Sequence, residues 1–145
     1  MQLTLQSDYS LRVLLYLSQT KNEMSTINEI SAFYKISKNH LVKVVHKLAQ
    51  LNYIISVQGK GGGIKLAKDP DDINIGDVIR KTEPNFYLVE CFNTKTNQCV
   101  ITDACRLRGM LNQGMEAFFK VLDQYTLQSG SKNSMAQQII NSLSG

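Results

Sequence analysis

The chain has 145 residues, of which 43% are hydrophobic, and carries 16 Lys or Arg against 12 Asp or Glu, a net charge of +4. This length suits one globular domain with an appendage, and no apolar run approaches the roughly 18 residues that a membrane-spanning helix needs. Because the sequence MQLTLQSDYS has neither the basic nor the apolar region of a secretory signal, we expect a cytoplasmic protein that does not contact a membrane.

The charge is unevenly distributed along the chain. Residues 1–68 contain nine Lys or Arg and three Asp or Glu, a net +6, whereas residues 69–145 contain seven and nine, a net −2. A basic N-terminal half suits a polyanion such as DNA, because neutralised phosphates release condensed counterions. A mildly basic solvated surface would give the same imbalance.

Three helices are expected in the first fifty residues. The segment YSLRVLLYLSQT, residues 9–20, has apolar residues on nearly every side and predicts a buried first helix. TINE at 26–29 matches a capping box and begins a short helix that ends at about Tyr34. A third helix is expected after the N-cap Ser37, and its core face repeats at three- and four-residue steps: Leu41, Val44, Val45 and Leu48.

The opposite face of the third predicted helix is basic and rich in amides, with Lys38, Asn39, Lys43, His46, Lys47 and Gln50. Two short helices joined by a turn, the second polar near its start, are typical of a helix-turn-helix whose second helix enters the major groove. An ordinary solvated helix hairpin is the alternative. The residues expected to contact DNA from this helix are Ser37, Lys38, Asn39, His40 and Lys43.

A glycine-rich hairpin is expected in YIISVQGKGGGIKLAKD. Residues 53–57 and 64–67 are rich in β-branched side chains and predict two strands around a tip at 58–63. The glycines let the backbone approach a ligand, and a lysine supplies charge for a phosphate or a minor groove. A nucleotide phosphate loop is rejected because its GK[ST] ending is absent. We predict a wing that contacts DNA through Gln58, Lys60 and Gly61, with a hairpin that binds nothing as the alternative.

The second half has a different character. DPDDINIGDVIRKTEP predicts a short helix from about Ile75 to Thr82 that ends before Pro84. Farther along, apolar residues recur over some five turns at Leu107, Leu111, Gly114, Phe118, Leu122 and Tyr125. A long helix with such a stripe needs a partner surface, and a second copy of the chain is the economical candidate. Packing on its own domain is the alternative.

All three cysteines, Cys91, Cys99 and Cys105, lie in one polar segment, ECFNTKTNQCVITDAC. In a reducing cytoplasm, clustered thiols indicate metal or redox chemistry before a disulfide framework. The spacing C-x7-C-x5-C lacks the CxxC pairs of zinc ribbons, whereas widely spaced thiolates suit an iron–sulfur cluster with one ligand still to be supplied. A cluster, direct oxidation of the thiols and a zinc that staples a dimer therefore all stay open.

Four features in combination carry a resemblance to a known family: ISKNHLVKVVHKLAQLNYI, the wing QGKGGGIKL, DPDDINIGDVIRKTE, and three cysteines ahead of a long helix. Over all but about its last dozen residues, the chain resembles the Rrf-two family of winged-helix regulators, and within it the nitric-oxide-sensitive repressors, which share an early SDYSLRVL stretch. The resemblance implies a homodimer that binds double-stranded operator DNA, carries a 4Fe–4S cluster near the dimer interface, and releases promoter DNA when nitric oxide nitrosylates the cluster.

The resemblance also implies the ligands. Cys91, Cys99 and Cys105 would be three of them, and Asp8 of the other subunit the fourth. A cap or first-turn residue of the first helix is the alternative role for this aspartate.

Two positions depart from the family pattern. Members that regulate iron–sulfur assembly have a histidine three residues after the last cysteine, where this chain has Arg108, which argues against that alternative. Many family wings have an arginine at the position of Gln58, so its minor-groove contact is lost or passes to Lys60.

The expected fold is mainly α with a small β-hairpin wing. We expect a winged helix-turn-helix domain in residues 1–83, a cysteine-containing cluster-binding loop in 84–105, a dimerisation helix in 106–128 and a C-terminal tail in 129–145, either frayed or a loosely attached short helix. No nucleophile paired with a base and no paired carboxylates stand out, so a transcriptional repressor is expected rather than an enzyme.

Overall fold

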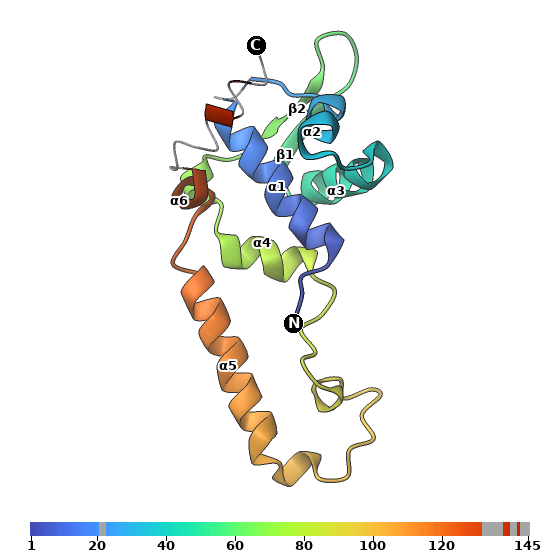
Figure 1. Ribbon diagram of the computed structural model, residues 1–145, viewed down its shortest axis with the longest axis vertical. Coiled ribbons are helices and arrows are strands. Elements are labelled where there is room, and N and C mark those ends of the chain that lie inside the picture. The colour runs from blue at the N-terminus through green and yellow to red at the C-terminus, as the bar shows by residue number, and fades with distance from the viewer. Residues whose placement is uncertain (21–22, 132–137, 140–141, 143–145) are drawn as a thin grey trace.

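The computed structural model describes residues 1–20, 23–131, 138–139 and 142. It is mostly helical with one two-stranded antiparallel sheet, which confirms the expected fold class. Figure 1 shows a globular part at one end and a long projection, built from helix α5 and the segment before it, at the other. No helix in the described part of the chain is long and apolar enough to span a membrane.

The first three helices are each begun by a hydroxyl side chain. Helices α1 (Leu5–Gln19), α2 (Ile27–Tyr34) and α3 (Lys38–Gln50) follow the N-caps Thr4, Thr26 and Ser37, and the predicted capping box between Thr26 and Glu29 is present. Each cap oxygen accepts a hydrogen bond from a backbone amide of the first turn, which would otherwise lack a partner. α1 begins four residues before the predicted start, because Thr4 caps it.

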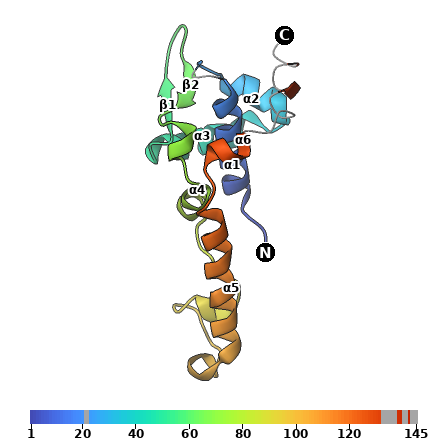
Figure 2. The ribbon, with the colours of Figure 1, turned by 90° about the vertical axis from the view of Figure 1, so that its left-hand side faces the viewer.

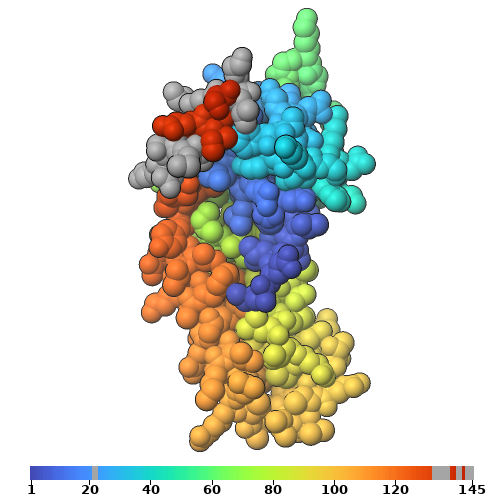
Figure 3. All heavy atoms as spheres, in the orientation of Figure 1, coloured from blue at the N-terminus to red at the C-terminus, as the bar shows by residue number. Residues whose placement is uncertain are grey.

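The wing is the antiparallel hairpin of β1 (Ile54–Val57) and β2 (Gly63–Leu66), with Val57 opposite Gly63 in register. At the tip, Gly59 and Gly61 have φ values of 97° and 77°, a left-handed conformation that side chains disfavour. The tip projects from the body of the molecule in Figure 3, free of covering atoms on the visible face.

After the wing, a 3₁₀ turn (Pro70–Asp72) leads to α4 (Ile75–Thr82), which ends before Pro84 as predicted. Short 3₁₀ turns at Glu90–Phe92 and Thr102–Ala104 precede α5 (Arg106–Leu122), and α6 (Leu127–Ser131) follows it. The long helix is thus shorter than the 106–128 expected, since the chain turns after Leu122.

One core joins α1, α2, α3, the wing and α4, with Leu14, Ile30, Leu41 and Val78 fully buried. α6 packs against α1, and Leu127 is only 2% exposed, so residues beyond α5 return to this core. We call residues 1–82 together with α6 the winged domain. The expected tail therefore begins with helical residues that are attached to the domain; its apolar residues Met135, Ile140 and Leu143 lie outside the described residues.

The projection, residues 84–122, is here called the arm. Figure 2 shows it standing away from the winged domain, with the preceding segment running alongside α5. None of the 36 consecutive residues 83–118 is buried, and Phe119 is the only buried residue of α5. The arm consequently lacks a hydrophobic core of its own within the single chain.

Candidate functional site

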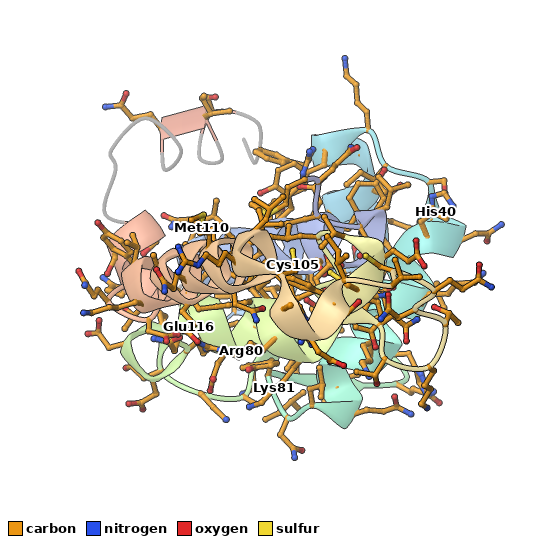
Figure 4. All side chains as sticks on the ribbon, turned by 90° about the horizontal axis from the view of Figure 1, so that it is seen from below. His40, Arg80, Lys81, Cys105, Met110 and Glu116 are labelled. Atoms are coloured by element: carbon orange, nitrogen blue, oxygen red, sulfur yellow. The ribbon has the colours of Figure 1, made fainter. Side chains whose placement is uncertain are left out.

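The exposed side of α3 carries the residues expected to contact the major groove. Ser37, Lys38, Asn39, His40 and Lys43 are all exposed, while the predicted core face of the same helix is buried. Figure 4 shows His40 at the periphery of the molecule, on α3. The start of α3 thus presents an amide, two lysines and an imidazole to solvent.

Two neighbours fix the start of α3. The Ser37 hydroxyl accepts from the backbone N of His40 at 3.4 Å, so this side chain serves as the helix cap. The His40 ring lies 6.2 Å from the Tyr9 ring, centroid to centroid, which connects α3 to the first half of α1.

The wing tip lies close to the start of α3. Gln58, Lys60 and Gly61 are exposed, and a groove of about 320 Å³ is lined by Lys38 of α3, by wing residues that include Gly59, and by residues at the start of α2. Asn28, in the first turn of α2, is among them, although the sequence analysis did not single it out. Only the fold brings it beside the wing, so the sequence carried no clear signal for it.

The cysteines are free thiols on the arm. Cys91 and Cys105 are half-buried and Cys99 is exposed. Figure 4 shows Cys105 at the start of α5. Among the described residues, no group of three or more His, Cys, Asp or Glu side chains is close enough to hold a metal ion. A single chain therefore does not gather the three cysteines with Asp8.

Local polar contacts nevertheless define the backbone around Cys99. The Asn97 carbonyl oxygen Oδ1 accepts from the Cys99 backbone N at 3.0 Å, and the Thr102 hydroxyl donates to the Cys99 carbonyl at 2.7 Å. Asn97 Nδ2 in turn donates to Thr102 Oγ1 at 2.8 Å. This small network holds the turn while leaving the thiol free.

Asp8 lies in the first turn of α1 and forms a bidentate ion pair with Arg12. Nε and Nη2 of Arg12 donate to the two carboxylate oxygens at 2.9 and 2.8 Å. These hydrogen bonds raise the pKa of the Arg12 guanidinium. Thr4, rather than Asp8, caps the helix, so of the two structural roles considered for Asp8 only the first-turn one applies.

A polar network joins the start of α1 to the root of the arm. The Glu83 carboxylate accepts from the Thr4 backbone N at 2.7 Å and from the Thr4 hydroxyl at 3.0 Å. Next to it, the Thr82 hydroxyl donates to the Ser7 hydroxyl at 2.9 Å, and both of these side chains are buried. The helix that carries Asp8 and the segment that leads to the cysteines are therefore directly connected.

At the other end of the arm, a second contact fastens α5 to α4. Arg80 forms a bidentate ion pair with Asp123, with N–O distances of 2.6 and 2.7 Å, and its guanidinium lies 4.3 Å from the centre of the Phe119 ring. The ion pair lowers the pKa of Asp123 and raises that of Arg80. A Cβ on Gly76 would meet the Asp123 carboxylate, so only glycine permits this approach. The sequence did not predict this contact, because Arg80 and Asp123 are 43 residues apart in the chain.

The side of α5 that faces away from α4 is apolar. Leu107 and Met110 are 61% and 63% exposed, and half-buried Leu111 and Phe118 continue the stripe. Figure 4 shows Arg80 and Glu116 where α4 and α5 face each other, and Met110 on the far side of α5. The stripe is thus open to a partner.

Comparison with known proteins identifies the family. The model of the Rrf2 (Rrf-two) family, described as an iron-dependent transcriptional regulator, matches residues 3–132. The HTH-type transcriptional regulator NsrR of Shouchella clausii is 51% identical over 88% of this chain and 86% of its own length. NsrR of Bacillus subtilis is 51% identical over 92% of both chains. These relatives are named as transcriptional regulators, which confirms the expectation of a role other than catalysis.

Solved structures share the fold. CymR, the global cysteine regulator of Bacillus subtilis, superposes with a TM-score of 0.72 at 23% identity, over 90% of this chain and 96% of that one. IscR of T. potens superposes with a TM-score of 0.71 at 21% identity, over 92% and 88%. With helix-turn-helix, wing and arm in place and a family match over nearly the whole chain, the protein belongs to the Rrf2 family and is a transcriptional regulator of the NsrR type.

Proposed function

We propose that the chain is a DNA-binding repressor that acts as a homodimer in the cytoplasm and senses nitric oxide through a 4Fe–4S cluster held on the arm. The observation that carries this proposal is the placement of all three free thiols on an arm whose only buried residue is Phe119, in a chain half identical to proteins named NsrR. Such an arm is suited to change its conformation with what it binds.

The proposed operator contacts divide between α3 and the wing. Ser37, Lys38, Asn39, His40 and Lys43 would enter the major groove, and Gln58, Lys60 and Gly61 would meet the adjacent backbone or minor groove. The shared groove between Lys38 and the wing supports a single continuous surface for DNA. Two such surfaces in a dimer would bind two half-sites of a palindromic operator.

The arm supports the proposal of a homodimer. A helix that leaves Leu107 and Met110 more than 60% exposed has an apolar stripe without a partner in its own chain. Large exposed apolar patches rimmed by polar residues mark interaction sites. A second copy is the proposed partner, because identical stripes on two antiparallel or parallel arms are self-complementary under twofold symmetry. In this arrangement residues 84–105 form the cluster-binding loop and α5 is the dimerisation helix.

The donor set on the arm fits an iron–sulfur cluster in kind. Cys91, Cys99 and Cys105 are accessible, are not paired with one another, and offer the soft thiolates that iron–sulfur clusters use. Asp8, whose side chain is 38% exposed, would supply the fourth ligand to the loop of the other subunit. Because Arg12 donates a hydrogen bond to each oxygen of this carboxylate, Arg12 would compete with iron for the carboxylate or would orient it through the remaining lone pairs.

When bound, the cluster would supply iron that reacts with nitric oxide. The residues of the chain would connect this reaction to DNA. Asp8 lies on α1, whose start is joined to the root of the arm through Thr4 and Glu83, and whose Tyr9 approaches His40 of α3. Loss of the contact between the cluster and Asp8 would therefore alter the position of both the arm and the DNA-binding helix α3. Promoter DNA would then be released.

Purification without oxygen tests the proposal. Iron and acid-labile sulfide in equal amounts, with cluster-dependent operator binding that nitric oxide abolishes, is the expected result. Protein without metal whose DNA binding follows the oxidation state of its thiols would support the thiol sensor instead. Zinc bound in place of iron would support a stapled DNA-binding module. Either of these two results would overturn cluster-based sensing.

Mixed dimers test whether Asp8 acts across the subunit interface. A dimer of one Asp8→Ala chain and one Cys99→Ala chain keeps one complete site if ligation crosses between subunits, but damages both sites if ligation stays within a chain. We expect these dimers to retain about half of the wild-type cluster. Retention no greater than in either single-variant homodimer would exclude the cross-subunit role.

A further inference from the structure

Val42 is the one large apolar residue of α3 that is not buried among its core residues; it is 47% exposed. Its neighbours at helical spacing are Lys38 and Asn39 one turn before it and His46 one turn after it, all of them exposed. Val42 therefore lies within the polar face proposed to enter the major groove.

A valine at this position has no structural reason within the chain. A β-branched residue is a poorer helix former than Lys, Gln or Glu, which usually occupy exposed helix positions. The core face of α3 is already complete with Leu41, Val44, Val45 and Leu48, each at most 6% exposed. The apolar surface of Val42 is thus available to a ligand of the polar face.

We propose that Val42 contacts the C5 methyl group of a thymine in the major groove and so determines specificity at that base pair. This inference rests on the DNA-binding role proposed above. The thymine methyl is the apolar group that B-DNA exposes in its major groove, and apolar side chains recognise it. Asn39, three residues earlier, carries the amide that pairs in a bidentate manner with adenine. The two together predict a preference for A·T pairs in neighbouring positions of each half-site.

Operator DNA selected in vitro from a random pool with the full-length protein provides the probe. Each conserved thymine is then replaced in turn by deoxyuridine, which removes only the methyl group and keeps every hydrogen-bonding edge. For one such position we expect the affinity of the wild-type protein to fall about three- to fourfold per half-site, which corresponds to the free energy of burying one carbon atom. When both half-sites are changed, the affinity should fall on the order of tenfold.

The variant Val42→Ala should abolish this dependence and bind thymine and deoxyuridine operators equally. Alanine is the strongest helix former, so α3 should remain folded in this variant. Val42→Thr keeps the branched shape but replaces one methyl by a hydroxyl, and should retain only part of the preference. Val121→Ala, at a similarly exposed valine on α5, is the matched control and should keep the full preference.

The outcomes separate this inference from the function on which it rests. If no operator can be selected, DNA binding itself fails. If the protein binds an operator but every thymine can be replaced without loss, or if Val42→Ala keeps the wild-type ratio of the two affinities, the thymine contact is wrong and the regulator role stands.

Discussion

At the scale of single residues, Asp8 is the side chain that connects the proposed binding of the cluster with the proposed binding of DNA. Its carboxylate is held by Arg12 in an exposed pair at i, i+4 spacing, a type that contributes only about 0.3–0.5 kcal/mol. Iron coordination would compete at most with an interaction of that modest strength. Arg12 is therefore suited to hold the free carboxylate in place without preventing its use as a ligand.

The first prediction concerns this competition. In Arg12→Gln, the carboxylate of Asp8 has no guanidinium partner, so the cluster should be retained longer during exposure to a chelator. Loss of the cluster is followed by its visible absorbance. Lys81→Gln is the control, because it breaks another exposed i, i+4 pair, with Asp77 on α4. Equal rates of loss in the two variants would argue against Asp8 as a ligand that Arg12 competes for.

The second prediction concerns a single charge at the wing. Lys60→Ala should weaken binding to all DNA sequences alike, because a phosphate contact carries no base information. In the proposed dimer two contacts are lost, so the slope of log K against log[salt] should become shallower by about 1.8. Titrations by fluorescence anisotropy at several salt concentrations measure it. Lys120→Ala, on α5, should leave the slope unchanged, and an unchanged slope for Lys60→Ala would place the wing away from DNA.

At the scale of elements, the sequence predicted what local chemistry determines. The predicted caps Thr26 and Ser37 each begin a helix, Asn74 caps α4, and the apolar repeat of α3 is buried. The ends of the two wing strands differ from the predicted ends by one residue at most. A hydroxyl or amide cap binds a backbone amide within one helical turn, so a short stretch of sequence is enough to predict it.

Elements defined by distant contacts were missed or misjudged. The sequence LQSGS of α6 has no helical apolar repeat, and the helix is fixed by its packing on α1 and by the Leu127 backbone N, which donates to the Ile73 carbonyl at 2.8 Å. α5 stops before Tyr125 although the apolar spacing continues, because Asn74 and Arg80 bind Asp123 just after its end. In both cases the contacting residues are far apart in the sequence.

The sequence predicted some residues of the candidate site and missed others. It selected the cysteines and the exposed face of α3, because residue type and spacing mark them. It did not reveal that Arg12 holds Asp8, although their i, i+4 spacing permits such a pair, nor the network of Glu83 with Thr4. The latter joins residues 79 apart, which only the fold brings together.

The third prediction concerns the contact between α4 and α5. Because Arg80 lowers the folded-state pKa of Asp123 below its usual 3.8, ionised Asp123 stabilises the fold. This stabilisation is present above the unfolded-state pKa and is lost as the pH falls through the lower, folded-state pKa. The Tm of the wild type should therefore exceed that of Asp123→Asn from about pH 5 upward, and the difference should shrink in acid.

Thermal unfolding from acid to neutral pH measures that difference. Asp103→Asn, in the 3₁₀ turn before α5, serves as the control and should not show the loss of Tm expected of Asp123→Asn at neutral pH. A gap between wild type and Asp123→Asn that stays constant through acid would mean that the ion pair with Arg80 does not contribute to stability in solution.

At the scale of the whole molecule, the chain divides into a domain with a core and an arm without one. A projection with 36 consecutive residues that lack burial has little to keep it in one conformation. The residues that flank it, Glu83 and Asp123, fasten it to the winged domain through Thr4 and Arg80. A partner arm would add contacts along its length, and the rotation of the arms would set the spacing of the two DNA-binding faces.

The fourth prediction tests that arrangement. Leu107→Glu places a charge in the apolar stripe of α5 and should convert the dimer to a monomer in sedimentation velocity, with operator affinity reduced at least tenfold because one half-site is lost. The winged domain should stay folded, since Leu107 is 61% exposed in the single chain. Gln113→Glu adds the same charge on the polar side of α5 and should remain dimeric. A dimeric Leu107→Glu protein would place the interface elsewhere.

The return of α6 to α1 has a consequence for how the protein is made. On the ribosome, residues are released in chain order, so the three thiols emerge before Leu127, and the core of the winged domain stays incomplete until the arm has been synthesised. The nascent chain therefore exposes its cysteines while its DNA-binding half is still unfinished. Truncation before residue 127 should leave a hole beside α1 rather than a shorter but intact domain, because α6 packs on α1 and Leu127 is buried.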